Sequence, residues 1–169
     1  GFGGSCFKKD ILNLVYIANH FGLKEVADFW ENVVSFNTFN QSRISQLIVK
    51  KLFGTISGKK ISILGFAFKA NTNDTRESPA IQICKDLIEE RAHLKIYDPK
   101  VNDFQIENDL GQKQVNYSEE GSWTYCKSVL DVATDADAIV IATEWEEFKS
   151  LDWSKISNLM RDPKWLFDT

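Results

Sequence analysis

The first part of the chain has apolar residues at helical spacing, and this periodicity ends near residue 57. Between residues 11 and 18 apolar side chains recur every three or four positions, which predicts a helix that stops at Gly22. A second apolar stripe runs from residue 24 to residue 53 without proline or glycine, and Gly54 ends it. A helix of about 30 residues is ~45 Å long, which is more than a small domain can cover. We therefore expect it to pack against a second chain or another domain.

Two asparagines, Asn37 and Asn40, lie near the apolar stripe of this long helix. One interpretation is that they set the register of a two-fold helix pair, as buried polar residues do in coiled coils. The other is that they are solvated side chains on a curved surface. The sequence alone does not separate these two interpretations.

After residue 58 short apolar runs alternate with helical segments. The runs predicted to be strands cover residues 60–66, 93–97, 138–142 and 165–167. One predicted helix has Ser78 at its N-cap and Pro79 at its first position, and two others cover residues 129–134 and 154–160. Residues 101–125 are polar and irregular and receive no assignment. The alternation predicts an α/β fold, a Rossmann-like doubly wound parallel sheet that binds ligands beyond the carboxyl ends of its strands. The chain thus divides into a helical segment, residues 1–57, and a sheet domain, residues 58–169.

The composition narrows the functional classes. The 169 residues are 43% hydrophobic and 26% charged with a net charge of -4, which suits one full core and excludes a broad basic surface for nucleic acid. No apolar run reaches the ~20 residues of a membrane-spanning helix, and no signal peptide opens the chain. The three cysteines are too few for a disulfide framework. They form no Cys-x-x-Cys pair, and the two histidines are isolated, so the sequence predicts no metal site. We expect a cytoplasmic protein, and the opening glycine suggests an incomplete chain.

The first candidate site is the glycine-rich opening, GFGGSCFKKD, at residues 1–10. A helix begins directly after it, so Cys6 lies near a helix N-terminus, where the macrodipole and the adjacent Lys8 and Lys9 favour a thiolate. Asp10 is one helical turn further along on the same face. A thiolate beside a carboxylate suits covalent catalysis, in which the thiol attacks the substrate and the acid positions a hydrolytic water. The alternative is a buried cysteine at a helix start.

The second candidate site is the loop at residues 65–78, between the first strand and the first helix of the sheet, where nucleotide phosphates bind in such folds. Its only glycine is Gly65, so it is not the Gly-x-Gly-x-x-Gly fingerprint of a tightly held dinucleotide. We expect Lys69 and Arg76 to reach phosphate with their side chains, and Phe68 to pack beside a base or sugar. The alternative is that both cations are solvated loop charges.

Acidic residues also follow two other predicted strands. Asp98 stands where dinucleotide-binding folds often place a ribose-binding acid. Because Asp-Pro is also a common way to leave a strand, we favour that structural interpretation. Three glutamates surround Trp145 after residues 138–142, and we expect a solvated turn there.

These motifs together resemble those of a known family. Four segments are similar, in the same order, to segments of the nucleotide-sugar dehydrogenases, the UDP-glucose/GDP-mannose dehydrogenase family. They are GFGGSCFKKD at residues 1–10, GFAFK through DTRES at 65–78, IYDPK at 96–100 and ATEW at 142–145. The resemblance covers nearly the whole chain and is weakest between residues 101 and 125. It implies an enzyme that oxidises the sugar C6 alcohol to a carboxylate in two NAD-dependent steps, with the long helix as a homodimerisation helix. The phenylalanine after the cysteine and the Thr-Glu-Trp segment favour UDP-glucose as the substrate.

The resemblance also implies roles for individual residues. Cys6 would form a thiohemiacetal and then a thioester, and Asp10 would assist the hydrolytic water. The residues implied to bind UDP-glucose are Gly1, Phe2, Gly3, Phe68 and Lys69, and those implied to bind NAD are Cys6, Phe7, Lys9 and Arg76.

The amino-terminal NAD-binding domain of that family, with its glycine-rich fingerprint, is not in this sequence, and neither is the arginine that the family carries soon after the last strand. We therefore expect a carboxyl-terminal fragment that is inactive alone and has its own N-terminal NAD-binding domain as a partner. Two alternatives remain. One is a related dehydrogenase for GDP-mannose or a UDP-N-acetylhexosamine, and the other is a non-catalytic nucleotide-binding or dimer-forming module.

Overall fold

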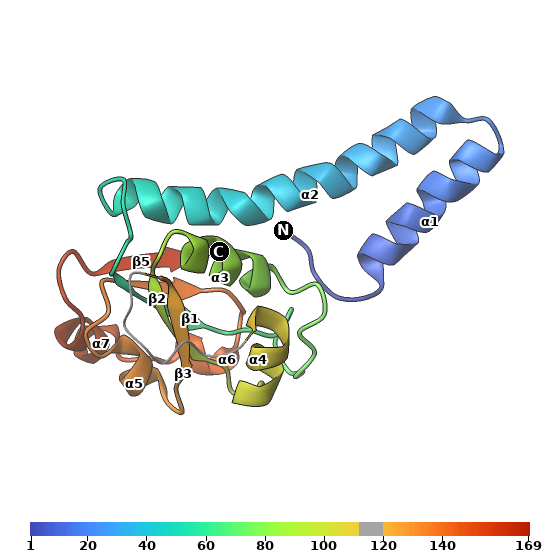
Figure 1. Cartoon of the computed structure of the whole chain (residues 1–169). Helices are drawn as coiled ribbons and strands as arrows, with labels where there is room; N and C mark the ends of the chain where they lie inside the picture. Colours follow the sequence, from blue (N-terminus) through green and yellow to red (C-terminus); the bar gives the residue numbers. More distant parts are fainter. Residues whose placement is uncertain (112–119) are drawn as a thin grey trace.

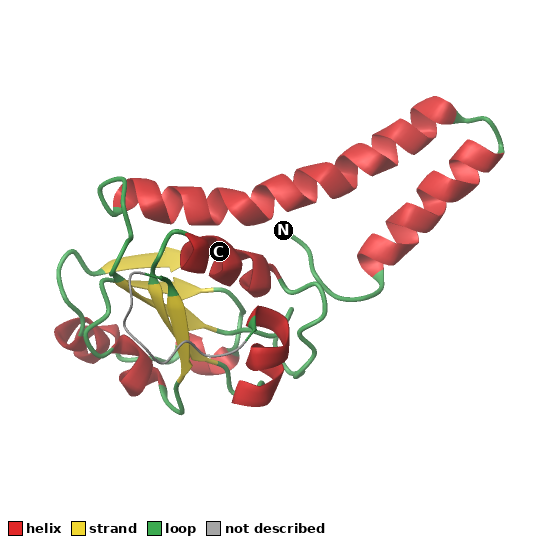
Figure 2. Cartoon of the chain, viewed as in Figure 1, coloured by secondary structure: helices red, strands yellow, loops and turns green. Residues whose placement is uncertain are grey.

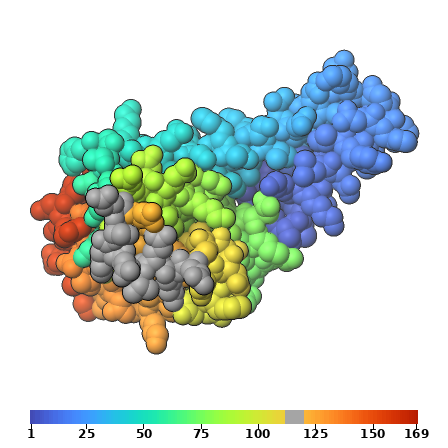
Figure 3. All heavy atoms as spheres, in the orientation of Figure 1, coloured from blue at the N-terminus to red at the C-terminus, as the bar shows by residue number. Residues whose placement is uncertain are grey.

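A helical hairpin precedes an α/β domain in the computed structural model, which describes residues 1–111 and 120–169 (Figure 1). The hairpin consists of α1 (Phe7–His20) and α2 (Lys24–Lys51). Gly22, with a φ of 72°, turns the chain between them, as the sequence predicts. At 28 residues, α2 is ~42 Å long. The amino-terminal half of α2 projects with α1 beyond the α/β domain (Figures 2 and 3).

The described residues of the second part form a parallel sheet of five strands in the order β3-β2-β1-β4-β5. The strands are β1 (Lys60–Leu64), β2 (His93–Tyr97), β3 (Ser122–Tyr125), β4 (Ala138–Ile141) and β5 (Trp165–Asp168). Each neighbouring pair is parallel, with Ile63 of β1 between Ile96 of β2 and Val140 of β4. The prediction of a doubly wound parallel sheet is therefore confirmed.

Helices cover both faces of this sheet. They are α3 (Pro79–Glu89), α4 (Asp103–Leu110), α5 (Val129–Ala133), α6 (Glu146–Lys149) and α7 (Trp153–Leu159). Ser78 caps α3 as predicted, because its side chain accepts a hydrogen bond from the Ala80 amide and Pro79 occupies the first helical position. Helix α3 packs against α2 on one side of the sheet, and α5 packs against α7 on the other (Figure 1).

Two segments differ from the sequence-based expectation. Residues 101–125, left without assignment, contain α4 and β3, while residues 112–119 of that stretch lie outside the described residues. Helix α4 begins with a capping box between Asn102 and Gln105 and buries only Ile106, so its apolar periodicity is weak. The three glutamates around Trp145 are exposed, as expected for a solvated turn, but residues 146–149 form the short helix α6 and Trp145 itself is buried.

The hydrophobic core crosses the predicted domain boundary at residue 58. Ile48, Leu52 and Ile56 are fully buried in the same cluster as Ile61 and Ile63 of the central strand. The carboxyl-terminal part of α2 is therefore packed as a layer of the α/β domain, and the division into residues 1–57 and 58–169 stays a prediction.

The projecting part of the hairpin exposes many large apolar side chains. They are Leu12, Leu14, Tyr16, Ile17, Phe21, Leu23, Val26, Phe29, Phe36 and Phe39. A helical surface this apolar is typical of an interface rather than of a free solvent-exposed face. None of the helices in the described part of the chain combines the length and hydrophobicity needed to cross a bilayer.

Candidate functional site

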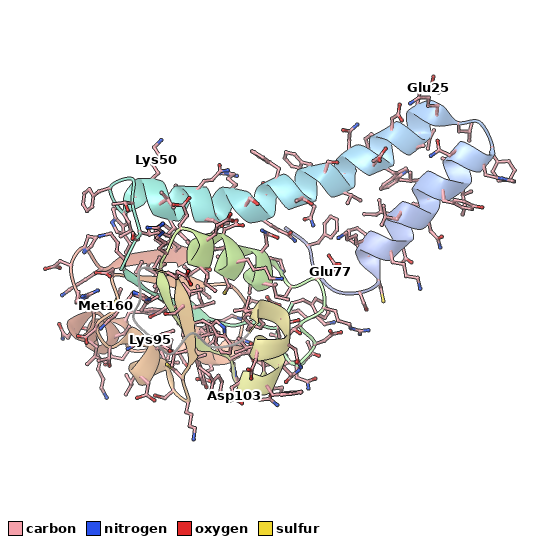
Figure 4. The ribbon with its side chains drawn as sticks, in the orientation of Figure 1. Glu25, Lys50, Glu77, Lys95, Asp103 and Met160 are labelled. Atoms are coloured by element: carbon pink, nitrogen blue, oxygen red, sulfur yellow. The ribbon has the colours of Figure 1, made fainter. Side chains whose placement is uncertain are left out.

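The two motif-bearing loops lie against each other. The amide of Gly4 donates to the carbonyl of Arg76 at 3.1 Å. The ammonium group of Lys8 forms an ion pair with Glu77 at 2.8 Å. Figure 4 shows Glu77 between the α/β domain and the start of α1. Two segments separated by about 70 positions therefore form one surface.

Glycine permits this close approach. A Cβ atom on Gly3 would collide with the carbonyl oxygen of Glu77. Gly4 has a φ of 86°, and a Cβ atom there would lie 2.8 Å from the ring of Phe68. Larger residues at either position would separate the two loops, so the glycines are needed to bring the backbone beside Phe68.

Helix α2 fixes the start of the cysteine loop through a buried asparagine. The amide of Phe2 donates to Asn37 Oδ1 at 2.7 Å, and Asn37 Nδ2 donates to the Phe2 carbonyl at 3.0 Å. Gln41 Nε2 donates to the same carbonyl at 3.2 Å. Asn37 is only 8% exposed. Asn37 is therefore not a solvated side chain, because it is buried and both of its polar atoms hold the loop.

We expect Asn37→Ala to release this loop. The substitution removes both hydrogen bonds to the Phe2 peptide, a loss of about 1–3 kcal/mol in local stability. Hydrogen exchange measured by mass spectrometry should therefore be about five- to a hundredfold faster in residues 1–6, since each 1.4 kcal/mol is a factor of ten. Asn32→Ala is the matched control, because Asn32 lies on the same helix and bonds only to the Asp28 carbonyl. Unchanged exchange in the Asn37→Ala variant would contradict this account of the loop.

Cys6 lies at the N-cap of α1 with an exposed side chain. Its position at a helix start is as predicted, and its exposure excludes the alternative of a buried cysteine. The Sγ atom lies 3.8 Å from the hydroxyl of Ser5. The Asp10 amide donates to the Cys6 carbonyl at 2.8 Å, so Asp10 is one helical turn further along, and its side chain is also exposed. The thiol and the carboxylate therefore share one exposed helical end.

Arg76 lies close to the cysteine loop but is held by a carboxylate. Its guanidinium bonds to both oxygens of Asp74, at 2.9 Å and 2.7 Å. This pair raises the pKa of Arg76 and lowers that of Asp74. Arg76 is therefore oriented by Asp74 rather than freely solvated, and an anion that binds it has to compete with that carboxylate or use its remaining N–H groups.

The exposure of the three cysteines predicts a selective reaction with iodoacetamide. Cys84 is fully buried and Cys126 is 9% exposed, and burial raises the pKa of both thiols, so few of these side chains are reactive thiolates at neutral pH. We expect Cys6 to be alkylated at least about a hundredfold faster than either, as followed by peptide mass spectrometry. The denatured chain, in which all three should react alike, is the control. Equal labelling of the three thiols in the folded chain would contradict this expectation.

A cavity of about 330 Å³ lies at the carboxyl edge of the sheet, where the doubly wound fold predicts a ligand. Two of the residues implied to bind substrate, Gly1 and Phe68, line it. The other lining residues come from α2, from α3 and from the ends of β4 and β5: Asn40, Gln41, Arg43, Ile44, Pro79, Ile83, Ala142, Glu144 and Thr169.

The cavity includes polar side chains of α2 that the sequence did not assign to a binding site. Asn40, Gln41 and Arg43 lie on α2 and face this cavity, although the apolar stripe of that helix suggested only packing. The visible signal was a polar interruption of the stripe at residues 40–43, just before Ile44. Arg43 contributes a cationic side chain to the lining of this cavity, which suits an anionic ligand.

The remaining predicted residues lie around the two loops. The ammonium group of Lys69 lies 5.3 Å from the centre of the Phe68 ring, and Phe2 packs edge-on against Phe7 at 4.7 Å. Lys9 lines a separate, more open cavity of about 480 Å³ beside Lys8 and Glu77. The two cavities thus separate the predicted sites. Gly1 and Phe68, predicted to bind substrate, line the smaller cavity, and Lys9, predicted to bind the cofactor, lines the larger one.

Asp98 does not present a free carboxylate to a ribose. It is 2% exposed, and both of its oxygens accept hydrogen bonds from N–H groups of the protein. This supports the structural interpretation that the sequence favoured. In the described residues no group of three or more His, Cys, Asp or Glu side chains is arranged to hold a metal ion.

Comparison with known proteins identifies the family. Residues 62–169 match the UDP-glucose/GDP-mannose dehydrogenase family, UDP binding domain. The chain is 46% identical to UDP-glucose 6-dehydrogenase 4 of Arabidopsis thaliana over 99% of its own length and 37% of the relative, and 47% identical to UDP-glucose 6-dehydrogenase of Drosophila melanogaster over 99% and 36%. The solved UDP-glucose dehydrogenase of Pyrobaculum islandicum superposes with a TM-score of 0.72 at 27% identity, covering 99% of this chain and 34% of that one. The chain therefore belongs to the UDP-glucose/GDP-mannose dehydrogenase family.

Proposed function

We propose that this chain supplies the catalytic cysteine and the sugar-nucleotide-binding surface of an NAD-dependent dehydrogenase that oxidises UDP-glucose to UDP-glucuronate. The observation that carries the proposal is the pairing of the Cys6 loop with the Phe68 loop beside a cavity at the carboxyl edge of the sheet. The chain spans 37% of the length of its Arabidopsis relative, a UDP-glucose 6-dehydrogenase. Activity is therefore proposed for a full-length protein that contains this chain, and not for the chain alone.

The proposed chemistry uses Cys6 as a nucleophile. After the C6 alcohol has been oxidised to an aldehyde, the Cys6 thiolate adds to the carbonyl carbon and forms a thiohemiacetal. Loss of a hydride from that carbon gives a thioester, and water then cleaves the carbon–sulfur bond to release a carboxylate and the free thiol. Asp10 orients this water and accepts its proton, since it lies one turn from Cys6 on the exposed end of α1. NAD supplies the hydride acceptor when it is bound.

The proposed substrate site combines the two loops. Gly1 and Phe68 line the 330 Å³ cavity, and Phe2 and Gly3 continue from Gly1 along the same loop. Lys69 extends from the Phe68 loop and offers an ammonium group to the diphosphate or sugar. We add Arg43 to this set, because it is a cation in the same cavity as Gly1 and Phe68.

The residues present also fit the phosphates of NAD. Lys9 lines an open cavity beside Ser5 and Glu77, and Arg76 presents an exposed guanidinium on the neighbouring loop. Two cations near Cys6 suit an anionic diphosphate, with Phe7 exposed beside them. We propose that an N-terminal NAD-binding domain of the same protein provides most of the dinucleotide site, in keeping with the greater length of the relatives.

We further propose that α2 pairs two copies of the protein. Its projecting half exposes Phe29, Phe36 and Phe39, which a second copy would bury. We also place the protein in the cytoplasm, because Cys6, Cys84 and Cys126 are all unpaired thiols and reducing compartments preserve them.

The substrate is tested by a panel of sugar nucleotides. We expect the full-length protein to form NADH from UDP-glucose and NAD, with kcat/KM at least about a hundredfold above those for GDP-mannose and UDP-N-acetylmannosamine, since ~2.7 kcal/mol of discrimination is within reach of a polar site. The isolated chain of 169 residues should form none. Turnover of GDP-mannose or UDP-N-acetylmannosamine without turnover of UDP-glucose would overturn the proposed substrate, and turnover of no sugar nucleotide would favour a non-catalytic binding module.

A further inference from the structure

Three buried polar side chains hold the loop that carries Phe68 and Lys69. Asp98 follows β2, and Thr143 and Trp145 follow β4, so the two strands on either side of β1 each contribute to the group. These side chains are 2%, 2% and 6% exposed. A buried polar group is stable only when it is hydrogen-bonded, so the partners of these three side chains are informative.

Asp98 organises the amino-terminal side of the loop. Its Oδ2 atom accepts from the amides of Phe66 at 2.7 Å and Ala67 at 3.1 Å. The indole N–H of Trp145 donates to the same oxygen at 3.1 Å. The other carboxylate oxygen accepts from the amides of Lys100 and Val101, at 2.8 Å and 2.9 Å. Because five N–H groups of the protein donate to this carboxylate, its acceptor sites are filled and none is left for a ligand.

Thr143 holds the other side of the same residue, Ala67. Its hydroxyl donates to the Ala67 carbonyl at 2.7 Å. Gly65 has a φ of 91°, and a Cβ atom there would collide with the Thr143 side chain, so glycine allows the threonine to approach. Ala67 is thus fixed at its N–H by Asp98 and at its carbonyl by Thr143, directly before Phe68.

We infer that Asp98, Thr143 and Trp145 are positioning residues for Phe68 and Lys69, and that they set the affinity for the sugar nucleotide without touching it. The inference rests on the proposed function of this loop. A loop already fixed in its binding conformation loses less entropy when the ligand binds. Loosening the Ala67 peptide should therefore weaken binding of the sugar nucleotide and leave binding of NAD unaffected.

Thr143→Val in the full-length protein tests the inference, because valine keeps the shape and removes the hydroxyl. We expect KM for UDP-glucose to rise about three- to tenfold, in line with the loss of one hydrogen bond, while KM for NAD stays within a factor of about two. The dissociation constant of UDP, measured by calorimetry, should rise by the same factor. Thr143→Ser, which restores the hydroxyl, should return both quantities toward the wild-type values.

Ser62→Ala is the matched control for stability. Ser62 is fully buried, and its hydroxyl donates to the Val132 carbonyl at 2.6 Å, away from the loop. This variant loses a comparable hydrogen bond, so its melting temperature should fall as in Thr143→Val while its KM for UDP-glucose stays unchanged. Equal rises of KM in the two variants would overturn the positioning role, because the effect would then follow general stability.

A second variant covers the case in which Thr143→Val does not fold. Trp145→Phe removes the indole N–H that donates to Asp98, together with part of a buried ring, and should also raise KM for UDP-glucose about two- to fivefold. If the wild-type protein turns over UDP-glucose and neither folded variant changes KM or UDP affinity, the inference is wrong although the proposed function stands. If the wild-type protein neither oxidises UDP-glucose nor binds UDP, the proposed function itself has failed.

Discussion

Cys6→Ser should reduce NADH formation from UDP-glucose by at least about a thousandfold in the full-length protein, in the range seen when an enzyme nucleophile is removed. Cys6 lies exposed at the N-cap of α1, on a loop held against the Phe68 loop. Serine keeps nearly the size of the side chain but replaces a thiol by a hydroxyl, which is a much weaker nucleophile without an activating base. Initial rates at saturating UDP-glucose and NAD provide the measurement.

The control for this variant is Cys84→Ala, which removes a fully buried thiol on α3. It should keep kcat within a factor of about two, because Cys84 contributes only to packing. UDP binding by the Cys6→Ser variant should also match that of the wild type. A Cys6→Ser protein with more than about a tenth of the wild-type rate would mean that the thiol isn't the nucleophile.

Charged residues in place of Phe36 and Phe39 should convert the proposed dimer into monomers. Phe36 and Phe39 are 62% and 55% exposed, and their rings stack at 6.0 Å on the projecting half of α2. Burying each side chain in a dimer would contribute about 1.5–3 kcal/mol. The double variant Phe36→Glu with Phe39→Glu should therefore weaken self-association at least about a hundredfold, as measured by light scattering across a concentration series.

Thr38→Glu is the control, because it adds a carboxylate at an exposed position between the two phenylalanines and leaves both rings in place. It should leave the dimer intact if the apolar contact of the two rings is what matters. Monomeric wild-type protein at micromolar concentration would contradict the proposed pairing outright. A dimer that persists in the double variant would place the interface elsewhere.

Much of the fold was predictable because its signals are local. Strand β2 was predicted with its observed bounds, since Asp98 and Pro99 terminate it, and α3 was marked by the Ser78 cap and Pro79. Residues 101–125 gave no such signal. Helix α4 buries one side chain, Ile106, and β3 is only four residues long, so tertiary packing decides both.

The two halves of the candidate site were predictable from their own residues, whereas their connection was implied only by the family resemblance and by no local pattern. Each glycine-containing motif indicates a ligand loop through its own residues. The contacts that join the loops, such as Gly4 to Arg76, link positions about 70 residues apart. Asn37 and Thr143 hold these loops from distant elements, and neither has a sequence pattern of its own, because a buried hydrogen bond depends on the partner that folding brings to it.

Trapping the covalent intermediate tests the central claim most directly. The Asp10→Asn variant of the full-length protein should still form the thioester but hydrolyse it slowly, since the amide cannot accept a proton from water. After incubation with UDP-glucose and NAD, mass spectrometry should find one UDP-glucuronyl group per chain on the peptide that contains Cys6, and none in the Cys6→Ser variant. An unmodified Cys6 peptide in a protein that continues to form NADH would contradict the account.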